Sequence, residues 1–397
     1  MKTILYDLSP LDTLSRVRGI GRYVRELARG LSRVADEKAD GVRIIGLVRV
    51  GWDGSYRITH DIGSFEGSPD VPKPDQADYY RWAYRRRLAL FRAVRSIGAD
   101  VVHLGDPNAT PLFMRLAGRC KRIVTCHDLI PSRYPDRYFS YKDGGPIVGS
   151  MIARRRYASA DLVVAISQAT ADDLVRLARI PRDRIVRVYN GVDVEGWGAP
   201  STAIPSEVAA RYGLQKPFLL YVGDGDWRKN IEGMIGGLSR ARAQGLDVEL
   251  AWAGKLSEVR LESLDREARA AGVRDAVRAL GYVPDDDLRE LYRAARAHLF
   301  VSRAEGFGLT VVEAMAAGCP VITTKAGSLG EVAGEAALTV DPEDHAAIGE
   351  AIARLCREDA LRDRLIERGK ERAPQFSNEI QARAMLDVYK RVANGKA

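Results

Sequence analysis

Short apolar segments alternate with amphipathic helical patterns along the whole chain, and this alternation constrains the fold more than any other feature. In the first half of the chain, these segments are residues 3–6, 43–50, 100–104, 122–126, 162–166 and 185–188. In the second half, they are residues 218–223, 248–253, 277–280, 297–301, 320–323 and 337–340. Such segments form parallel sheets that helices cover on both faces. The sequence therefore predicts an α/β protein with two doubly wound sheets.

The chain has 397 residues, enough for two domains that each bury a core. A polar, proline-containing segment at residues 198–206 interrupts the alternation and is interpreted as a linker. We place an N-terminal domain at residues 1–195 and a second domain at residues 196–377. A last helical pattern occupies residues 378–397. The glycine-, proline- and aspartate-rich residues 52–80 are expected to form a long loop.

The charge balance indicates an anionic partner. Lys and Arg number 61 against 53 Asp and Glu, a net charge of +8. The basic residues lie mostly on helical patterns without interleaved aromatic residues, so nucleic acid is not expected as a partner. A phosphorylated small molecule and an anionic membrane surface remain. The arginine-rich helical pattern at residues 81–95 is either an ordinary surface helix or a helix that docks on a membrane.

The sequence contains no apolar run long enough to cross a membrane, and Met1-Lys2 leads directly into a strand rather than a signal peptide. We expect a cytoplasmic protein. The four cysteines and five histidines form no cluster with the spacing of metal ligands, so the cysteines are interpreted as buried thiols in a reducing compartment. No metal site is expected.

Residues 305–324, EGFGLTVVEAMAAGCPVITT, follow an apolar strand with a glycine loop and a helical pattern. Glycines let the backbone approach a ligand closely, and a helix N-terminus suits phosphate oxygens. Glu305 and Glu313 flank the loop, and a carboxylate can accept hydrogen bonds from sugar or ribose hydroxyls. In the alternative interpretation Glu313 only complements a helix N-terminus and Glu305 lies in a solvated loop. The surrounding residues favour a binding loop.

This stretch resembles the E-x7-E signature of retaining glycosyltransferases with the GT-B fold, in particular family 4. The match includes four residues between the two glutamates: Phe307, Gly308, Leu309 and Thr310. The resemblance implies that Glu305 faces the donor sugar, that Glu313 holds the ribose, and that backbone N–H groups of the loop contact sugar and phosphates. It also implies two facing Rossmann-like domains with a cleft between them, and a final helix, 378–397, that packs back on the N-terminal domain.

Arg228 and Lys229 lie at a strand-to-helix turn, GDGDWRKN, at the start of the second domain. The resemblance implies that this basic pair grips the donor diphosphate and neutralises the leaving group; the alternative is two exposed cations. The family often carries a further arginine where this chain has Asp224, so one phosphate contact is either missing or differently supplied. Asp224 and Asp226 also spell the D-x-D metal signature of another glycosyltransferase fold. We reject that interpretation for two reasons. An acidic metal site would be self-defeating beside the cations Arg228 and Lys229, and the other fold has one such sheet whereas this chain is expected to have two.

Three residues of the first domain are candidates for the same site. Gly19 and Gly21 open a helical pattern after the first strand, where a doubly wound sheet binds ligands, although a plain turn is the alternative. The resemblance implies that this loop closes over the donor phosphates and the acceptor. His127 ends a strand and, by the same resemblance, lies beside the donor sugar, with Asp128 next to it as a further candidate. For His103, which also ends a strand, we expect a structural role.

The resemblance implies a metal-independent, configuration-retaining hexosyltransferase without a cofactor. RGIGRY, HDLIP and the GDGDWRKN turn are similar to bacterial mannosyl- and rhamnosyltransferases of surface polysaccharide or O-antigen assembly. GDP-mannose is the favoured donor, with UDP-glucose and dTDP-rhamnose open. The expected acceptor is a saccharide linked to a lipid diphosphate, reached from the inner face of the plasma membrane. Two other classes stay open: a non-catalytic subunit of a glycan synthase, and a hydrolase or epimerase acting on nucleotide sugars.

Overall fold

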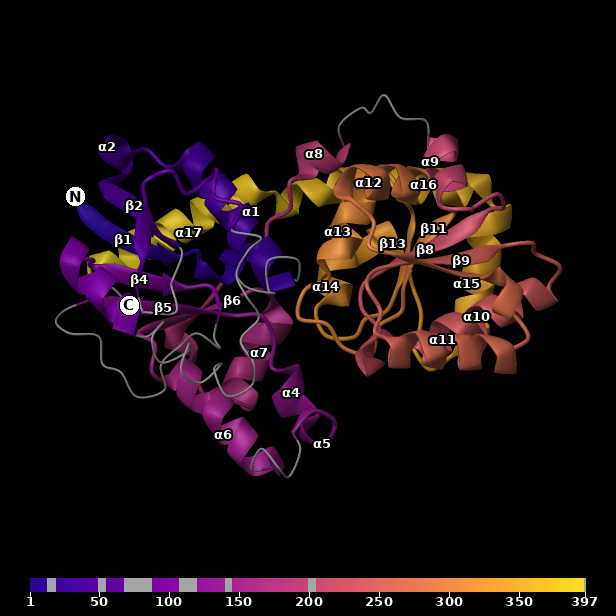
Figure 1. The fold of residues 1–397 in the computed structure, drawn as a ribbon, viewed down its shortest axis with the longest axis horizontal. Coiled ribbons are helices and arrows are strands. Elements are labelled where there is room, and N and C mark those ends of the chain that lie inside the picture. Colours follow the sequence, from indigo (N-terminus) through magenta and orange to yellow (C-terminus); the bar gives the residue numbers. More distant parts are fainter. Residues whose placement is uncertain are drawn as a thin grey trace. The chain divides into compact units, whose positions relative to one another are not determined.

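The computed structural model describes residues 1–12, 19–48, 55–67, 88–106, 120–139, 145–198 and 205–395 (Figure 1). Its contacts divide the chain into two compact units. Unit 1 comprises Met1–Gly191 with Ser377–Ala397, and unit 2 comprises Val192–Phe376. The sequence interpretation placed the end of the first domain at residue 195 and a linker at residues 198–206.

Residues 199–204 of the predicted linker lie outside the described ranges. The chain leaves unit 1 earlier, between Gly191 and Val192. Val192 is already buried in unit 2, where its N–H donates a hydrogen bond of 2.9 Å to the Phe376 carbonyl.

The sheet of unit 1 has seven strands in the order β3-β2-β1-β4-β5-β6-β7. Their bounds are β1 (Lys2–Asp7), β2 (Val42–Val48), β3 (Arg57–Thr59), β4 (Val101–Leu104), β5 (Lys121–Cys126), β6 (Leu162–Ala165) and β7 (Ile185–Arg187). All neighbours pair in parallel except β2 and β3. The six parallel strands are the predicted ones. The strand β3 corrects the expectation of a continuous loop over residues 52–80.

The helices of unit 1 include one from the far end of the chain. They are α1 (Gly19–Val34), α2 (Glu37–Asp40), α4 (Ile130–Arg133), α5 (Pro135–Tyr138), α6 (Gly145–Ala158), α7 (Gln168–Arg176) and α17 (Asn378–Ala393), with a further helical stretch at 88–97. The C-terminal helix α17 packs beside α1 (Figure 1). A Cβ atom at Gly30 of α1 would collide with the carbonyl of Asn378, so this close packing requires glycine.

The sheet of unit 2 has six strands, all parallel, in the order β10-β9-β8-β11-β12-β13. Their bounds are β8 (Phe218–Val222), β9 (Glu249–Ala253), β10 (Val277–Gly281), β11 (Ala297–Phe300), β12 (Val321–Thr323) and β13 (Ala337–Thr339). All six were predicted from the sequence. The strand order reverses between β8 and β11, as it does between β1 and β4 in unit 1. In doubly wound sheets ligands bind at this switch point, at the carboxyl ends of the strands.

Helices cover both faces of the second sheet, with α10 and α11 on one side and α12 and α16 on the other (Figure 1). The helices of unit 2 are α8 (Val194–Gly198), α9 (Pro205–Arg211), α10 (Ile231–Ala243), α11 (Glu258–Ala270), α12 (Asp285–Ala294), α13 (Leu309–Ala316), α14 (Leu329–Ala333), α15 (His345–Arg357) and α16 (Asp359–Arg372). The two strands at the switch point lead directly to the predicted site. The basic turn follows β8, and the glycine loop follows β11.

Candidate active site

The turn after β8 holds Arg228 and Lys229 against the glutamate after β11. A short 3-10 helix, Trp227–Lys229, begins at Asp226, whose Oδ1 accepts a hydrogen bond of 3.1 Å from the Arg228 backbone N–H. The Arg228 Nη1 atom lies 2.8 Å from Glu305 Oε2, and the Lys229 Nζ atom lies 2.7 Å from Glu305 Oε1. The structure thus brings together three predicted site residues. It excludes the alternative in which the two cations are simply exposed, since Lys229 is only 8% exposed.

The charge state of Glu305 follows from its surroundings. Burial acts to raise the pKa of this carboxyl group, but the charges of Lys229 and Arg228 outweigh it and hold the pKa below its ordinary value. Glu305 is therefore ionised at neutral pH. The Lys229 ammonium also lies 4.8 Å from the centroid of the Phe300 ring, within the range of a cation–π contact. The result is a preformed cluster of charges at the switch point.

The glycine loop after β11 has a backbone that only glycine adopts easily. Gly308, the residue before α13, has φ of 101°, and a Cβ atom there would stand 2.7 Å from Leu329 Cδ2. The Ser328 hydroxyl shares its one proton between the carbonyl oxygens of Glu305, at 3.2 Å, and Phe307, at 2.9 Å. The Phe307 ring packs edge-on against Phe376 at 5.7 Å. These contacts hold the loop in one conformation at the N-terminus of α13.

The remaining predicted donor-site residues of unit 2 lie on α13. Glu313 is only 2% exposed and lies past the first turn of α13, which begins at Leu309. Thr310 places its hydroxyl 3.3 Å from Nε2 of the buried His298, and its carbonyl accepts a hydrogen bond from the Tyr292 hydroxyl. Leu309 begins the helix. The six positions that match the family signature thus extend from the loop after β11 through the first turns of α13.

The two aspartates of the D-x-D sequence have roles within the turn. Asp226 caps the 3-10 helix and lies 3.5 Å from Arg228 Nε, while Asp224 Oδ1 accepts a hydrogen bond of 3.3 Å from the Asp226 N–H. The Asp224 carbonyl accepts a hydrogen bond from Tyr221. Within the described ranges, no group of three or more His, Cys, Asp or Glu side chains is arranged to hold a metal ion.

In unit 1, His127 lies at the carboxyl end of β5. Its Nε2 atom is 2.6 Å from the Gly105 carbonyl, so Nε2 carries the proton and Nδ1 is the acceptor nitrogen. Burial lowers the pKa of His127, which keeps the ring neutral at neutral pH. The ring also contacts Tyr23 of α1 edge-on at 4.9 Å. Gly19 and Gly21 form the first turn of α1, and residues 13–18 before them are outside the described ranges.

His103, the other histidine at a strand end, belongs to a buried polar network. Its Nδ1 lies 2.8 Å from the Tyr389 hydroxyl of α17, and its Nε2 lies 2.8 Å from the Thr125 hydroxyl. Burial lowers the pKa of His103 to about 3. With both nitrogens bonded inside the fold, this side chain has the structural role that we expected.

Sequence reasoning missed two residues that hold the basic turn. Asn230 follows Lys229 directly, has a left-handed backbone, and is fully buried. Arg303 donates from its backbone N–H to the Arg228 carbonyl at 2.7 Å. The sequence could have indicated Asn230, because asparagine tolerates left-handed geometry, caps helices, and stands here between a basic pair and a helix. No local signal marked Arg303.

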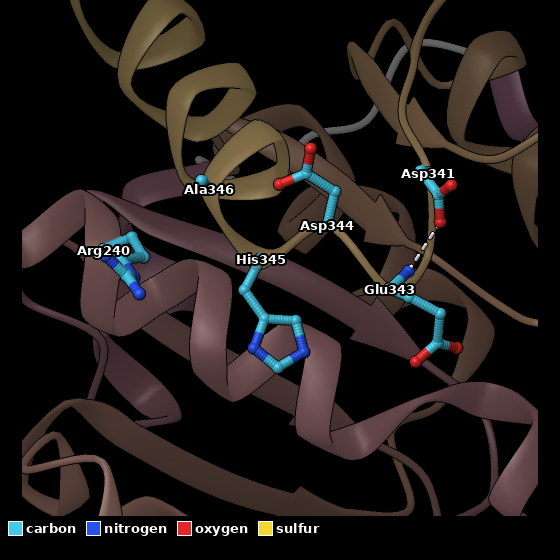
Figure 2. Close-up of a pocket in the computed structure, with 6 residues that line it drawn as sticks. All are labelled: Arg240, Asp341, Glu343, Asp344, His345 and Ala346. Atoms are coloured by element: carbon cyan, nitrogen blue, oxygen red, sulfur yellow. Dashed lines mark hydrogen bonds between the residues drawn. The ribbon is translucent and has the colours of Figure 1, made fainter.

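A shallow hollow of about 510 Å³ also lies in unit 2, next to the start of α15 (Figure 2). Its lining residues are Arg240, Asp341, Glu343, Asp344, His345 and Ala346. They include none of the residues predicted for the site. One of them, Glu343, forms an ion pair of 2.5 Å with Arg303. Among the described residues, no helix has the length and apolar composition needed to span a membrane.

Comparison with known proteins agrees with the geometry. Residues 17–195 match the model of Glycosyltransferase Family 4, and residues 209–372 match that of Glycosyl transferases group 1. The O-antigen chain mannosyltransferase B of Escherichia coli is 33% identical over 329 residues, covering 80% of this chain and 81% of that protein. The D-inositol 3-phosphate glycosyltransferase of Xylanimonas cellulosilytica is 32% identical over 96% of this chain and 94% of its own length.

A solved structure extends the match to the fold. The sucrose-phosphate synthase of Thermosynechococcus elongatus superimposes with a TM-score of 0.75 over 100% of both chains, at 21% identity. At this identity the similarity concerns the fold alone. Together with the two family models and the two parallel sheets of Rossmann strand order, it establishes the GT-B fold. The chain therefore belongs to glycosyltransferase family 4, the group 1 glycosyltransferases.

Proposed function

We propose that the protein transfers a hexose from a nucleotide sugar to a saccharide acceptor, with retention of configuration, in the assembly of a bacterial surface polysaccharide. The observation that carries this proposal is the cluster of Arg228, Lys229 and Glu305 at the β8–β11 switch point. Two cations beside a glycine loop and a helix N-terminus match the needs of a donor diphosphate. The carboxylate between them matches the hydroxyls of a donor sugar.

The reaction breaks the bond between the anomeric carbon and a phosphate oxygen, and the electron pair leaves with the nucleoside diphosphate. Negative charge therefore grows on the diphosphate in the transition state, where Arg228, Lys229 and the N-terminus of α13 stabilise it more than in the ground state. The acceptor oxygen bonds to the same face of the anomeric carbon, and its proton passes to the departing phosphate. Because two side-chain cations offset the charge, we propose that neither a metal ion nor a cofactor takes part.

The proposed donor is GDP-mannose, because the Escherichia coli relative at 33% identity is an O-antigen chain mannosyltransferase. The relative at 32% identity is a glycosyltransferase acting on D-inositol 3-phosphate, so the family includes other substrates. UDP-glucose and dTDP-rhamnose are the alternative donors. The role proposed for Glu313 is to bind the ribose, and it applies to each of these nucleotides.

A thermal-shift screen tests the donor site. The purified protein is heated with GDP, UDP, dTDP and ADP and with their common sugar conjugates, beside a Glu313→Ala control. A ligand that binds only the folded protein raises the melting temperature by mass action. We expect stabilisation by nucleotides of a single base, lost in the control. No shift with any nucleotide would contradict the proposal and favour a non-catalytic subunit. In a separate assay without acceptor, release of free sugar from the donor would favour a hydrolase.

We propose a saccharide on a lipid diphosphate as the acceptor, bound by unit 1 at the inner face of the plasma membrane. The net charge of +8 supports contact with anionic lipid. Residues 81–87 of the arginine-rich segment 81–95 lie outside the described ranges. Residues 88–97 are helical. Co-sedimentation with anionic vesicles, compared with neutral vesicles, tests this contact. Equal recovery with both vesicle types, together with full activity on short water-soluble acceptors, would contradict it.

A further inference from the structure

We infer that Asn230 is a positioning residue for sugar transfer, which fixes the turn carrying Arg228 and Lys229 relative to Glu305. This inference rests on the proposed function, since it concerns the same donor site. Asn230 follows Lys229 directly and is 0% exposed, so it cannot itself contact solvent or a bound nucleotide at the surface. Any influence on the reaction is therefore exerted through the two cations.

The backbone of Asn230 turns the chain from the basic pair into α10. Its φ and ψ are 62° and 57°, in the left-handed region, and among the described non-glycine residues only Arg179 also has positive φ. The Asn230 N–H closes the 3-10 helix by donating to the Trp227 carbonyl. This conformation costs most residues energy, and asparagine tolerates it better than most. The basic turn thus ends at a sharp and fixed change of direction.

The side chain of Asn230 connects the turn to three other segments. Its Nδ2 donates hydrogen bonds to the carbonyl of Val301 at 3.0 Å and to the carbonyl of Pro342 at 2.7 Å. Its Oδ1 accepts a hydrogen bond of 3.0 Å from the Gly233 N–H in the first turn of α10. Val301 follows β11 directly and lies on the segment that leads to Glu305. Asn230 therefore links the strand end that carries Glu305 to the turn that carries the cations.

The surrounding residues pack closely against the Asn230 amide. A Cβ atom on Gly233 would collide with Asn230 Nδ2, so glycine at 233 gives the amide its space. Arg303 supports the same turn from its outer side, because its Nη1 donates to the Trp227 carbonyl at 3.2 Å. Arg303 is in turn held by Glu232 and by Glu343, which projects from the loop before α15 (Figure 2). The basic turn is therefore held by the hydrogen bonds of Asn230 and by those of Arg303.

A small displacement of a cation weakens its effect on the growing charge of the diphosphate. A misplacement of about 1 Å from a change away from the chemistry can lower a rate about 100-fold. An interaction that matters mostly in the transition state lowers kcat when it is lost, with a smaller effect on KM. Asn230→Gly keeps the left-handed backbone and removes the three side-chain hydrogen bonds. This variant isolates the positioning effect.

The test measures kcat and the donor KM for the full-length wild type, for Asn230→Gly and for Leu355→Ala, well below each melting temperature. Leu355 is fully buried near the C-terminal end of α15, so its substitution destabilises unit 2 without touching the turn. We expect a fall in kcat of about 10–100-fold for Asn230→Gly, with donor KM changed by less than about threefold. Leu355→Ala should leave both constants near their wild-type values.

Two outcomes overturn the inference, and they are distinguishable from failure of the proposed function. Asn230→Gly with wild-type kcat contradicts it, and so does an equal fall in kcat for Leu355→Ala, which would show a general effect of stability. In both cases the wild type transfers sugar, so the proposed function stands. A wild-type protein that binds no nucleoside diphosphate and transfers no sugar would overturn the proposed function and the positioning role together.

Discussion

The Lys229 ammonium lies 2.7 Å from one carboxylate oxygen of Glu305, although 76 residues separate them in the chain. Arg228 occupies the other oxygen at 2.8 Å. A carboxylate bonded on both oxygens by cations is a weak base and a poor nucleophile, because its negative charge is already compensated. The geometry therefore favours a role for Glu305 in holding cations and sugar hydroxyls over a role as the attacking group.

Replacing Lys229 with methionine should lower kcat/KM by about 100- to 1,000-fold, because one of the two cations at the leaving group is lost. Lys216→Met is the matched control, since Lys216 lies on the surface of the same unit and pairs with Asp247. Steady-state kinetics with the donor identified by the thermal-shift screen measures the effect. Retention of more than half of the activity in Lys229→Met would show that this lysine does not stabilise the departing diphosphate.

Gly327→Ala should abolish most of the activity, because a Cβ atom at residue 327 collides with the backbone carbonyl of Glu305. Gly245→Ala is the control. Both glycines have positive φ, 61° and 81°, but a Cβ at residue 245 meets no atom within 4 Å. Each substitution costs roughly 1–2 kcal/mol of stability through the left-handed backbone alone. Melting temperatures and transfer rates measured on both variants separate the two effects, and equal activities would disprove the displacement of Glu305.

Chelation should leave the transfer rate unchanged if Arg228 and Lys229 supply the positive charge. The assay compares the rate of nucleoside diphosphate release after dialysis against EDTA with the rate after addition of Mg²⁺ or Mn²⁺. A loss of activity on dialysis that either ion restores would refute metal-independent transfer. It would also favour a metal-binding role for Asp224 and Asp226 in the same turn.

Acid should destabilise the protein below the ordinary pKa of histidine. Burial lowers the pKa of His103 to about 3 and that of His298 to about 4 from an unfolded value of 6.5. Between the lowered pKa values of the folded protein and the unfolded value of 6.5, the unfolded chain binds protons that the folded chain does not. The unfolding free energy therefore falls as pH decreases. Each histidine contributes about 1.4 kcal/mol per pH unit to this slope at most.

Denaturant titrations between pH 4 and pH 7 measure the slope of the unfolding free energy against pH. This range covers the interval in which the unfolded histidines are protonated and the folded ones are not. His103→Gln removes one titrating group, so its curve should be flatter than that of the wild type over this range. An identical slope in the variant would show that His103 takes up a proton in the folded state. The comparison depends on slopes, so a lower absolute stability of the variant does not affect it.

Local sequence was sufficient to predict the twelve parallel strands, because buried strands between amphipathic helices leave a periodic signal. The strand β3 left no such signal. Its three residues, Arg57–Thr59, are largely exposed and form a strand only because the edge of β2 is available for pairing. The point at which the chain passes from unit 1 to unit 2 left no local signal either, since only packing shows that Val192 belongs to unit 2.

The sequence by itself determined the fold class and the residues of the two motifs of the predicted site, because each motif is a short contiguous stretch. Only the tertiary structure decided how the motifs meet. The strand order places β8 beside β11, and this long-range pairing brings Arg228 and Lys229 to Glu305. The same pairing lets Asn230 reach Val301 and Pro342, 71 and 112 residues further along the chain. Hydrogen bonds at such separations depend on how strands assemble, and local composition carries no record of them.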